Sequence, residues 1–335
     1  MPPVVALVGP TASGKSRIAL EAALRSGSDR RAAGIPGWSV ELVSVDSMAV
    51  YRGMDIGTAK PTPEARARVP YHLLDLVDCS DEFTVQQFQQ AARAALTAIA
   101  GRGRAALLVG GTGLYLRSVV DDLSFPGRFP EVAAELSDRV DRAGPEGSTG
   151  QREVLDQLHR HLSDLDPVAA GRIEPTNVRR LVRALEVTLG SGRRFSEYGP
   201  GLERYPPTEV TLVGIDREPE DLDRRIAERF SGLMDLGLLD EVRSLLAGPG
   251  GISRTARQAL GYRELLAHLE VGVPLVEAVD QAIRRTRMFA RRQRAWFRRD
   301  PRIVWLDPDD DPVAGILSTV GDIPEPARGW ENDTR

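Results

Sequence analysis

The residue pattern with the clearest chemistry lies close to the N-terminus. Residues 9–16 match G-x-x-x-x-G-K-[ST], a loop whose backbone N–H groups surround phosphate oxygens. In such a loop the lysine supplies a positive charge and the last hydroxyl supplies one ligand for Mg²⁺. A helix that starts directly after the loop adds its partial positive charge. The pattern therefore predicts a phosphate or diphosphate site at Gly9, Pro10, Thr11, Ala12, Ser13, Gly14, Lys15 and Ser16, with Ser16 as the magnesium ligand.

A carboxylate and a Gly-rich turn each follow a further apolar segment. Asp46 comes directly after residues 40–45, and Gly110-Gly111-Thr112-Gly113 follows residues 104–109. Ligands of parallel sheets lie outside the carboxyl ends of the strands, so both segments are expected beside the phosphate loop. Asp46 has three possible roles: a Mg²⁺ ligand, a base for a hydroxyl or an amine, or a cap for the next helix. Thr112 is expected to place its hydroxyl on a diphosphate or bridging oxygen, unless the glycines mark a plain tight turn.

Residues 284–299 carry eight arginines and no acid, with aromatic residues interleaved. Helical spacing predicts that five of the arginines form one basic stripe. A stripe of one sign suits a nucleic-acid backbone, whereas a solvated helix usually mixes charges. The alternative is an exposed face without a ligand. The stripe consists of Arg284, Arg287, Arg291, Arg294 and Arg298.

The composition is that of a globular protein. The 335 residues are 41% hydrophobic and 27% charged, with a formal net charge of −4. No apolar run approaches the roughly 20 residues that span a bilayer, and no basic segment precedes the first apolar run. Cys79 is the only cysteine, which excludes an internal disulfide and a Cys-rich zinc site. We therefore expect a cytoplasmic protein without a membrane partner.

Apolar runs and helical spacing alternate along the chain. Strands are expected at 4–8, 40–45, 104–109, 210–215 and 302–306, and a polar loop at 25–38. Helices are expected at 18–24, 84–100, 131–143, 151–162, 175–189, 220–246, 255–269 and 275–299. The alternation predicts an α/β fold, a P-loop NTPase-like doubly wound parallel sheet with a helical insertion domain. Residues 1–120 and 201–306 would form the core with its basic C-terminal helices, 121–200 the insertion, and 307–335 a flexible tail.

Taken together, these motifs resemble the bacterial tRNA dimethylallyltransferases, also called isopentenyl-tRNA transferases. The resemblance runs in family order from residue 9 to about residue 300, and the long second motif is the most specific. Besides residues 9–16, the matching stretches are SVDSMAVYRGMDIGTAKP (44–61), YHLLD (71–75), GGTGLY (110–115), RALEV (183–187) and QALGYREL (258–265). One departure is Ala133, which follows Pro130-Glu131-Val132 where the family usually has an arginine nearby.

The resemblance implies transfer of a prenyl group from dimethylallyl diphosphate to N6 of adenosine 37, beside the tRNA anticodon. Asp46 would be the base for N6, and Thr112 would support the diphosphate. Residues 9–16 with Mg²⁺ would hold the leaving diphosphate, and the insertion would contact the anticodon stem-loop. The flipped adenine and its neighbours would be contacted by Asp46, Ser47, Met48, Ala49 and Thr112. A monomer is expected.

The residues alone leave other functions open. A P-loop kinase or NTPase for a small molecule would use the same ATP-binding loop, and an RNA-binding module could keep a nucleotide switch. Prenylation of free adenine nucleotides is a closer alternative, although a mononucleotide needs no stripe of arginines. Prenyl transfer also fits the chemistry, because adenine N6 is a poor nucleophile and the departing diphosphate needs charge stabilisation. An anticodon loop yields an unstacked base more easily than a duplex does.

Overall fold

The computed structural model describes residues 2–32, 39–199 and 201–321, which form two compact units. The first unit contains the residues up to Asp121 and those from Pro207 onward. The second unit runs from Asp122 to Pro206, and these bounds are close to those of the insertion that the sequence predicts at 121–200. Within the described ranges, no helix combines the length and the apolar character that crossing a membrane requires.

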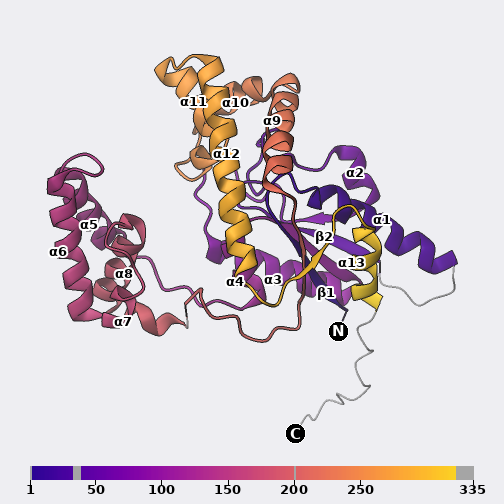
Figure 1. Cartoon of the computed structure of the whole chain (residues 1–335), viewed down its shortest axis with the longest axis horizontal. Coiled ribbons are helices and arrows are strands. Elements are labelled where there is room, and N and C mark those ends of the chain that lie inside the picture. The colour runs from indigo at the N-terminus through magenta and orange to yellow at the C-terminus, as the bar shows by residue number, and fades with distance from the viewer. Residues whose placement is uncertain (1, 33–38, 200, 322–335) are drawn as a thin grey trace, which may run out of the picture. The chain divides into compact units, whose positions relative to one another are not determined.

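One parallel sheet forms the centre of the first unit (Figure 1). Among the described residues it has six strands in the order β3-β2-β4-β1-β5-β6, which confirms the predicted doubly wound α/β fold. Strands that are covered on both faces read as continuous apolar runs, as VVALV does. The strands are β1 (Val4–Val8), β2 (Val40–Val45), β3 (Tyr71–His72), β4 (Ala105–Gly110), β5 (Thr211–Ile215) and β6 (Val304–Leu306).

Alternate residues of each central strand enter two separate cores. Ala6 and Val8 of β1 belong to the larger core, whereas Val5 and Leu7 belong to the smaller one on the other face. This alternation is the two-residue period of a strand with both faces buried. The helices of this unit are α1 (Lys15–Ala32), α2 (Pro63–Arg68), α3 (Val85–Gly101), α4 (Gly113–Val120), α9 (Pro219–Asp235), α10 (Leu238–Ala247), α11 (Tyr262–Val271), α12 (Leu275–Arg298) and α13 (Pro312–Gly321).

Local signals explain where several helices begin and end. Thr84 and Gln87 form the predicted capping box of α3. The predicted helix at 220–246 is wrong as a single element, because Gly237 takes φ +93° and separates α9 from α10. The predicted helix at 255–269 is instead a 3₁₀ turn, Ala256–Gln258, followed by α11.

The second unit is helical and has its own core. Apolar positions of its helices form one cluster that includes Leu158, Leu162, Leu181 and Leu185. Ser148 caps α6 by accepting the Gln151 N–H at 3.2 Å. The helices are α5 (Pro130–Arg142), α6 (Thr149–Leu165), α7 (Pro167–Ala170) and α8 (Val178–Ser191), and a 3₁₀ turn follows at Phe195–Tyr198.

Two segments that were predicted to be irregular are helical in part. Residues 25–32 continue α1, where the buried Ser26 hydroxyl donates to the Ala23 carbonyl and accepts the Val40 N–H. Tertiary contact with β2 thus keeps helical a segment whose composition favours a loop.

The predicted tail at 307–335 is wrong for residues 312–321, which form α13. Val313 and Ile316 of α13 are buried, and the helix packs on α1 and β1. Residues 33–38 and 322–335 lie outside the described residues.

Candidate functional site

The phosphate loop connects β1 to α1 and has a constrained backbone. Ala12 and Gly14 have φ of +64° and +96°, and α1 begins at Lys15. Left-handed residues let successive N–H groups turn inward, which is the geometry of an anion-binding nest. Gly9 is required for another reason, because a Cβ there would lie 2.1 Å from the Ile215 carbonyl oxygen of β5. The loop therefore lies directly against the end of the neighbouring strand.

Lys15 is buried inside this loop and carries a perturbed charge. Its Nζ donates to the Pro10 carbonyl at 2.7 Å. Loss of hydration, and then repulsion from Arg229, lowers the pKa of Lys15 to about 7, while attraction to Asp46 opposes the shift. The negative charge of a bound anion would favour the protonated form of Lys15. Anion binding is therefore expected to raise the pKa of Lys15.

Asp46 and Thr112 lie beside the loop because three strands end at the same level. Val8 of β1 and Val45 of β2 both pair with Gly110 of β4. The Thr112 Oγ1 accepts the Ser47 N–H at 3.3 Å, which joins the turn after β4 to the turn after β2. The expectation that the three segments share one sheet edge is confirmed.

One Asp46 oxygen serves the backbone and the other remains open. Oδ1 accepts the N–H groups of Met48 at 2.8 Å and Ala49 at 3.4 Å, so Asp46 caps a turn and not the helix that was predicted to follow it. No hydrogen bond to Oδ2 occurs among the described residues. The capping bonds hold the carboxylate in one orientation, and Oδ2 is left to accept a proton. Capping and a role as base are therefore compatible in this residue.

Three side chains that complete this edge come from distant parts of the chain. The Arg229 guanidinium of α9 lies 3.5 Å from the Thr11 hydroxyl. Arg217, just after β5, donates to the Ser13 carbonyl at 3.3 Å. The Gln293 amide of α12 bonds both to the loop and to the Gly111 carbonyl. Short-range sequence patterns gave no signal for these residues, since each lies about 200 or more positions from the loop.

The predicted arginine stripe lies on α12, but much of it is paired within the chain. Arg287 donates to the Asp223 carbonyl, and Arg291 binds the Asp223 carboxylate at 2.8 Å. Arg294 and Arg298 both bind Asp216. Figure 1 shows α12 running beside α9, which carries Asp223. The stripe is therefore not a free cationic face, because Asp216, just after β5, and Asp223 of α9 neutralise part of it.

The arginines that face solvent are a partly different set. The side chains of Arg287 and Arg294 are half-buried, where they contact Asp223 and Asp216. Arg284 is exposed and has no ion pair among the described residues. The exposed arginines of α12 and of its C-cap form a surface that we call the basic face, which consists of Arg284, Arg291, Arg292, Arg298 and Arg299.

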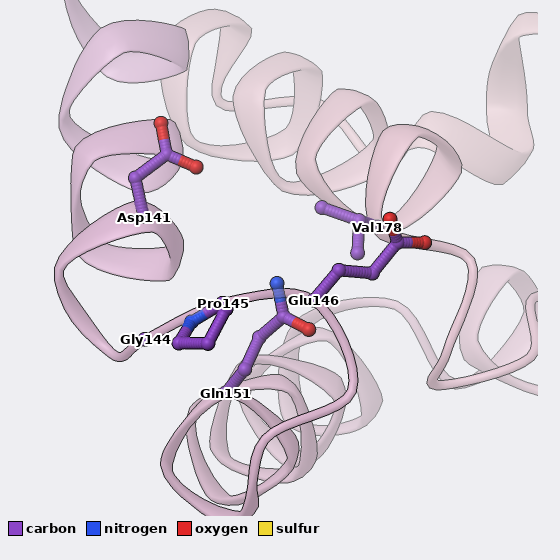
Figure 2. Close-up of a pocket in the computed structure, with 6 residues that line it drawn as sticks. All are labelled: Asp141, Gly144, Pro145, Glu146, Gln151 and Val178. Carbon is purple, nitrogen blue, oxygen red and sulfur yellow. The ribbon is translucent and has the colours of Figure 1, made fainter.

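A cavity of about 700 Å³ lies within the second unit, between α5, α6 and the start of α8 (Figure 2). The carboxylates of Asp141 and Glu146 line it together with the Gln151 amide and Val178. Two carboxylates repel an anion, so this cavity does not suit a diphosphate. The phosphate loop, with its buried lysine, remains the candidate anion site.

Known proteins resemble this chain over nearly its whole length. Residues 49–300 match the family described as IPP transferase. The chain is 43% identical to a tRNA dimethylallyltransferase of Desulforudis audaxviator, over 96% of this chain and 98% of that protein. It is 44% identical to the tRNA dimethylallyltransferase of Streptomyces coelicolor, over 91% of this chain and 90% of that one. The crystal structure of the tRNA isopentenylpyrophosphate transferase of Bacillus halodurans aligns with a TM-score of 0.65, 34% identity and 96% coverage of both chains.

Proposed function

The chain belongs to the IPP transferase family, and we propose that it is a tRNA dimethylallyltransferase that moves a dimethylallyl group from dimethylallyl diphosphate to N6 of adenosine 37 in tRNA. The observation that carries this proposal is that the phosphate loop and the oriented Asp46 carboxylate lie at the same edge of the sheet. Lys15 and Asp46 follow β1 and β2, which both pair with β4, and attraction to the Asp46 carboxylate favours the charged form of Lys15. A leaving diphosphate and a proton acceptor are the two groups that this reaction needs on either side of the allylic carbon.

We infer that the loop at residues 9–16 binds the diphosphate. Lys15 would exchange its bond to the Pro10 carbonyl for a diphosphate oxygen, and Arg229 supplies a second cation beside Thr11. The Ser13 hydroxyl is buried and lacks a hydrogen-bond partner among the described residues, as expected of a loop that a ligand completes. Charge on the departing diphosphate is stabilised by these donors as the C–O bond breaks.

The residues at the start of α1 fit a Mg²⁺ ion that is held largely by the diphosphate. Ser16 is exposed one residue after Lys15, where its hydroxyl can contribute one ligand. The described residues contain no group of three or more His, Cys, Asp or Glu side chains that could hold a metal. Mg²⁺ commonly keeps several waters and takes substrate phosphates as ligands. When bound, it neutralises charge on the leaving group.

Asp46 is the residue that we propose removes the proton from adenine N6. Its Oδ1 is fixed by the Met48 and Ala49 N–H groups, which leaves Oδ2 for the amine. As the N6–C1 bond forms and the C1–O bond breaks, the N6 proton passes to Asp46 and the electron pair leaves with the diphosphate. Thr112, which belongs to the glycine turn, accepts the Ser47 N–H and so lies beside the residue that follows Asp46. We propose that Ser47, Met48, Ala49 and Thr112 contact the adenosine and its neighbours.

We propose that the basic face of α12 binds the tRNA backbone through Arg284, Arg291 and Arg298. Arg287 and Arg294 are half-buried and would support the face through Asp223 and Asp216. The second unit is proposed to contact the anticodon stem-loop. Backbone contacts position an RNA without reading its sequence.

Salt dependence tests the basic face. The double change Arg284→Gln and Arg291→Gln is expected to weaken binding of all tRNAs alike. It should also make the log–log dependence of affinity on salt shallower by about one to two units, because each lost phosphate contact removes roughly 0.7–0.9. Titrations at several salt concentrations measure the slope. Arg243→Gln with Arg254→Gln, two exposed arginines outside α12, is the matched control, and an equal slope change there would contradict the assignment.

The pKa of Lys15 gives a second measurable consequence. With a pKa of about 7 in the free protein, Lys15 is expected to lose its charge as the pH rises through that value. Because bound diphosphate stabilises the ammonium form, its affinity should fall as pH rises above 7, by at most tenfold per pH unit. The affinity for inorganic diphosphate is measured at pH 6–9 as a ratio to Lys15→Met, which cancels the titration of the ligand. A ratio that does not change with pH would contradict the assignment.

One reaction tests the function as a whole. The protein is incubated with labelled dimethylallyl diphosphate, Mg²⁺ and bulk tRNA, and the digested RNA is examined for prenylated adenosine. Label in adenosine next to the anticodon is the expected result. If the tRNA gains no label and the protein instead transfers a phosphoryl group from ATP to a small molecule, the result would support a kinase.

A further inference from the structure

The Gln293 side chain joins two separate parts of the candidate site. It is 7% exposed and lies near the C-terminal end of α12. Its Oε1 accepts the Thr11 N–H at 2.8 Å, and its Nε2 donates to the Gly111 carbonyl at 2.8 Å. One amide group therefore links the phosphate loop after β1 to the turn after β4 that carries Thr112.

The two hydrogen bonds require a primary amide. The Thr11 N–H needs an acceptor and the Gly111 carbonyl needs a donor, so the orientation of the amide is fixed. A carboxylate would lack the donor, and an ammonium group would lack the acceptor. Losing the amide would leave two half-buried backbone groups without these partners. Glutamine is thus chemically specified at this position rather than being one of several polar residues that fit.

Close packing fixes how α12 lies on the glycine turn. A Cβ at Gly111 would lie 2.2 Å from the Gln293 Nε2, and a Cβ at Gly113 would lie 2.1 Å from the Trp296 Nε1. Gln293 and Trp296 are one helical turn apart, so α12 contacts the turn along a continuous edge. Neither glycine has a positive φ. Both are therefore glycines because of close approach, not because of backbone conformation.

We propose that Gln293 is a positioning residue for prenyl transfer, which holds the diphosphate loop and the Thr112 turn at a fixed separation. This inference rests on the function proposed above. The diphosphate is assigned to one of these segments and the adenosine contacts to the other, so their separation sets the distance between leaving group and nucleophile. Reaction rates are sensitive to displacements of about 1 Å at such sites. Gln293 itself forms its bonds to backbone groups of the protein.

The experiment compares Gln293→Met with Gln281→Met, the same change at another glutamine of α12 that is not bonded to the site. For Gln293→Met we expect kcat to fall by about 10–100-fold, with the KM for tRNA within about threefold of wild type. The dissociation constant of inorganic diphosphate should rise, because the loop is no longer held. Gln281→Met should match wild type in all three. Rates are expressed per folded protein, with the folded fraction taken from circular dichroism.

A double-mutant cycle separates positioning from a loss of packing. Gly111→Ala leaves the backbone conformation accessible but pushes the Gln293 amide away from the Gly111 carbonyl. It should therefore reproduce the loss of kcat in the wild-type background and have little further effect in Gln293→Ala. Effects that multiply independently would overturn the proposal. So would a kcat and a diphosphate affinity of Gln293→Met within about threefold of wild type.

Failure of the proposed function would be recognised separately. If the wild-type protein prenylates no tRNA, the proposed function fails, and the affinity for inorganic diphosphate alone decides the role of Gln293. A weaker diphosphate complex in Gln293→Met and Gly111→Ala, but not in Gln281→Met, would then support it. Equal affinity in all variants would overturn it.

Discussion

The Asp46→Asn protein is expected to fold and to bind both substrates, but to transfer the prenyl group about 10²–10⁴ times more slowly. Asparagine can keep Oδ1 as the acceptor for the Met48 and Ala49 N–H groups, so the turn after β2 is retained. Its amide nitrogen replaces Oδ2 and cannot take a proton from N6 at neutral pH. Single-turnover kinetics with both substrates saturating measure the chemical step directly.

The control for this change is Asp235→Asn, which removes one exposed acid at the end of α9. It should leave the single-turnover rate within a factor of two of wild type. If Asp46→Asn also reacts within a factor of a few of wild type, the carboxylate positions the turn and is not the base. Unfolding curves of both variants show whether a lower rate reflects lost structure.

Replacing Lys15 with methionine is expected to remove most of the prenyl transfer while tRNA binding stays nearly intact. Methionine fills a similar volume but cannot donate to the diphosphate, and removing one such donor commonly costs about 10²–10³ in rate. The affinity for inorganic diphosphate should fall in parallel. Filter binding of tRNA and single-turnover transfer are measured on the same preparation.

Arg17→Met is the matched control, because Arg17 lies two residues further along α1 with a side chain that is 74% exposed. It removes a positive charge near the loop without removing a group that faces the ligand. Its transfer rate is expected to stay close to wild type. Loss of tRNA binding in Lys15→Met, with diphosphate binding unchanged, would contradict the assignment of the loop to the diphosphate.

Besides Lys15 the sequence has one lysine, Lys60, and it illustrates how a motif residue can be structural. Lys60 belongs to the stretch that most resembles the family, and its side chain is almost fully buried. It pairs with Asp55 and Asp75 and donates to the Tyr51 carbonyl at 2.6 Å. Lys60 therefore fastens the segment that follows Asp46 rather than facing the phosphate loop. Sequence alone could not separate these two roles.

The sequence by itself determined the parts of the site that depend on short-range order. The phosphate loop was predictable because its residues are contiguous and its strand and helix flank it directly. The proximity of Asp46 and Thr112 to that loop was also predictable, because parallel strands end at a common edge, as the pairing of Val8 and Val45 with Gly110 confirms.

Only the tertiary structure decided which distant side chains join that edge. Gln293 and Arg229 reach Thr11 across 282 and 218 positions, and no local period encodes such contacts. The stripe on α12 looked uniformly basic because its acidic partners, Asp216 and Asp223, belong to other segments. Likewise, α13 was mistaken for a tail because its stability comes from Val313 and Ile316 packing on α1. Ion pairing and burial depend on the distance between elements in space, which the spacing of residues along one element does not contain.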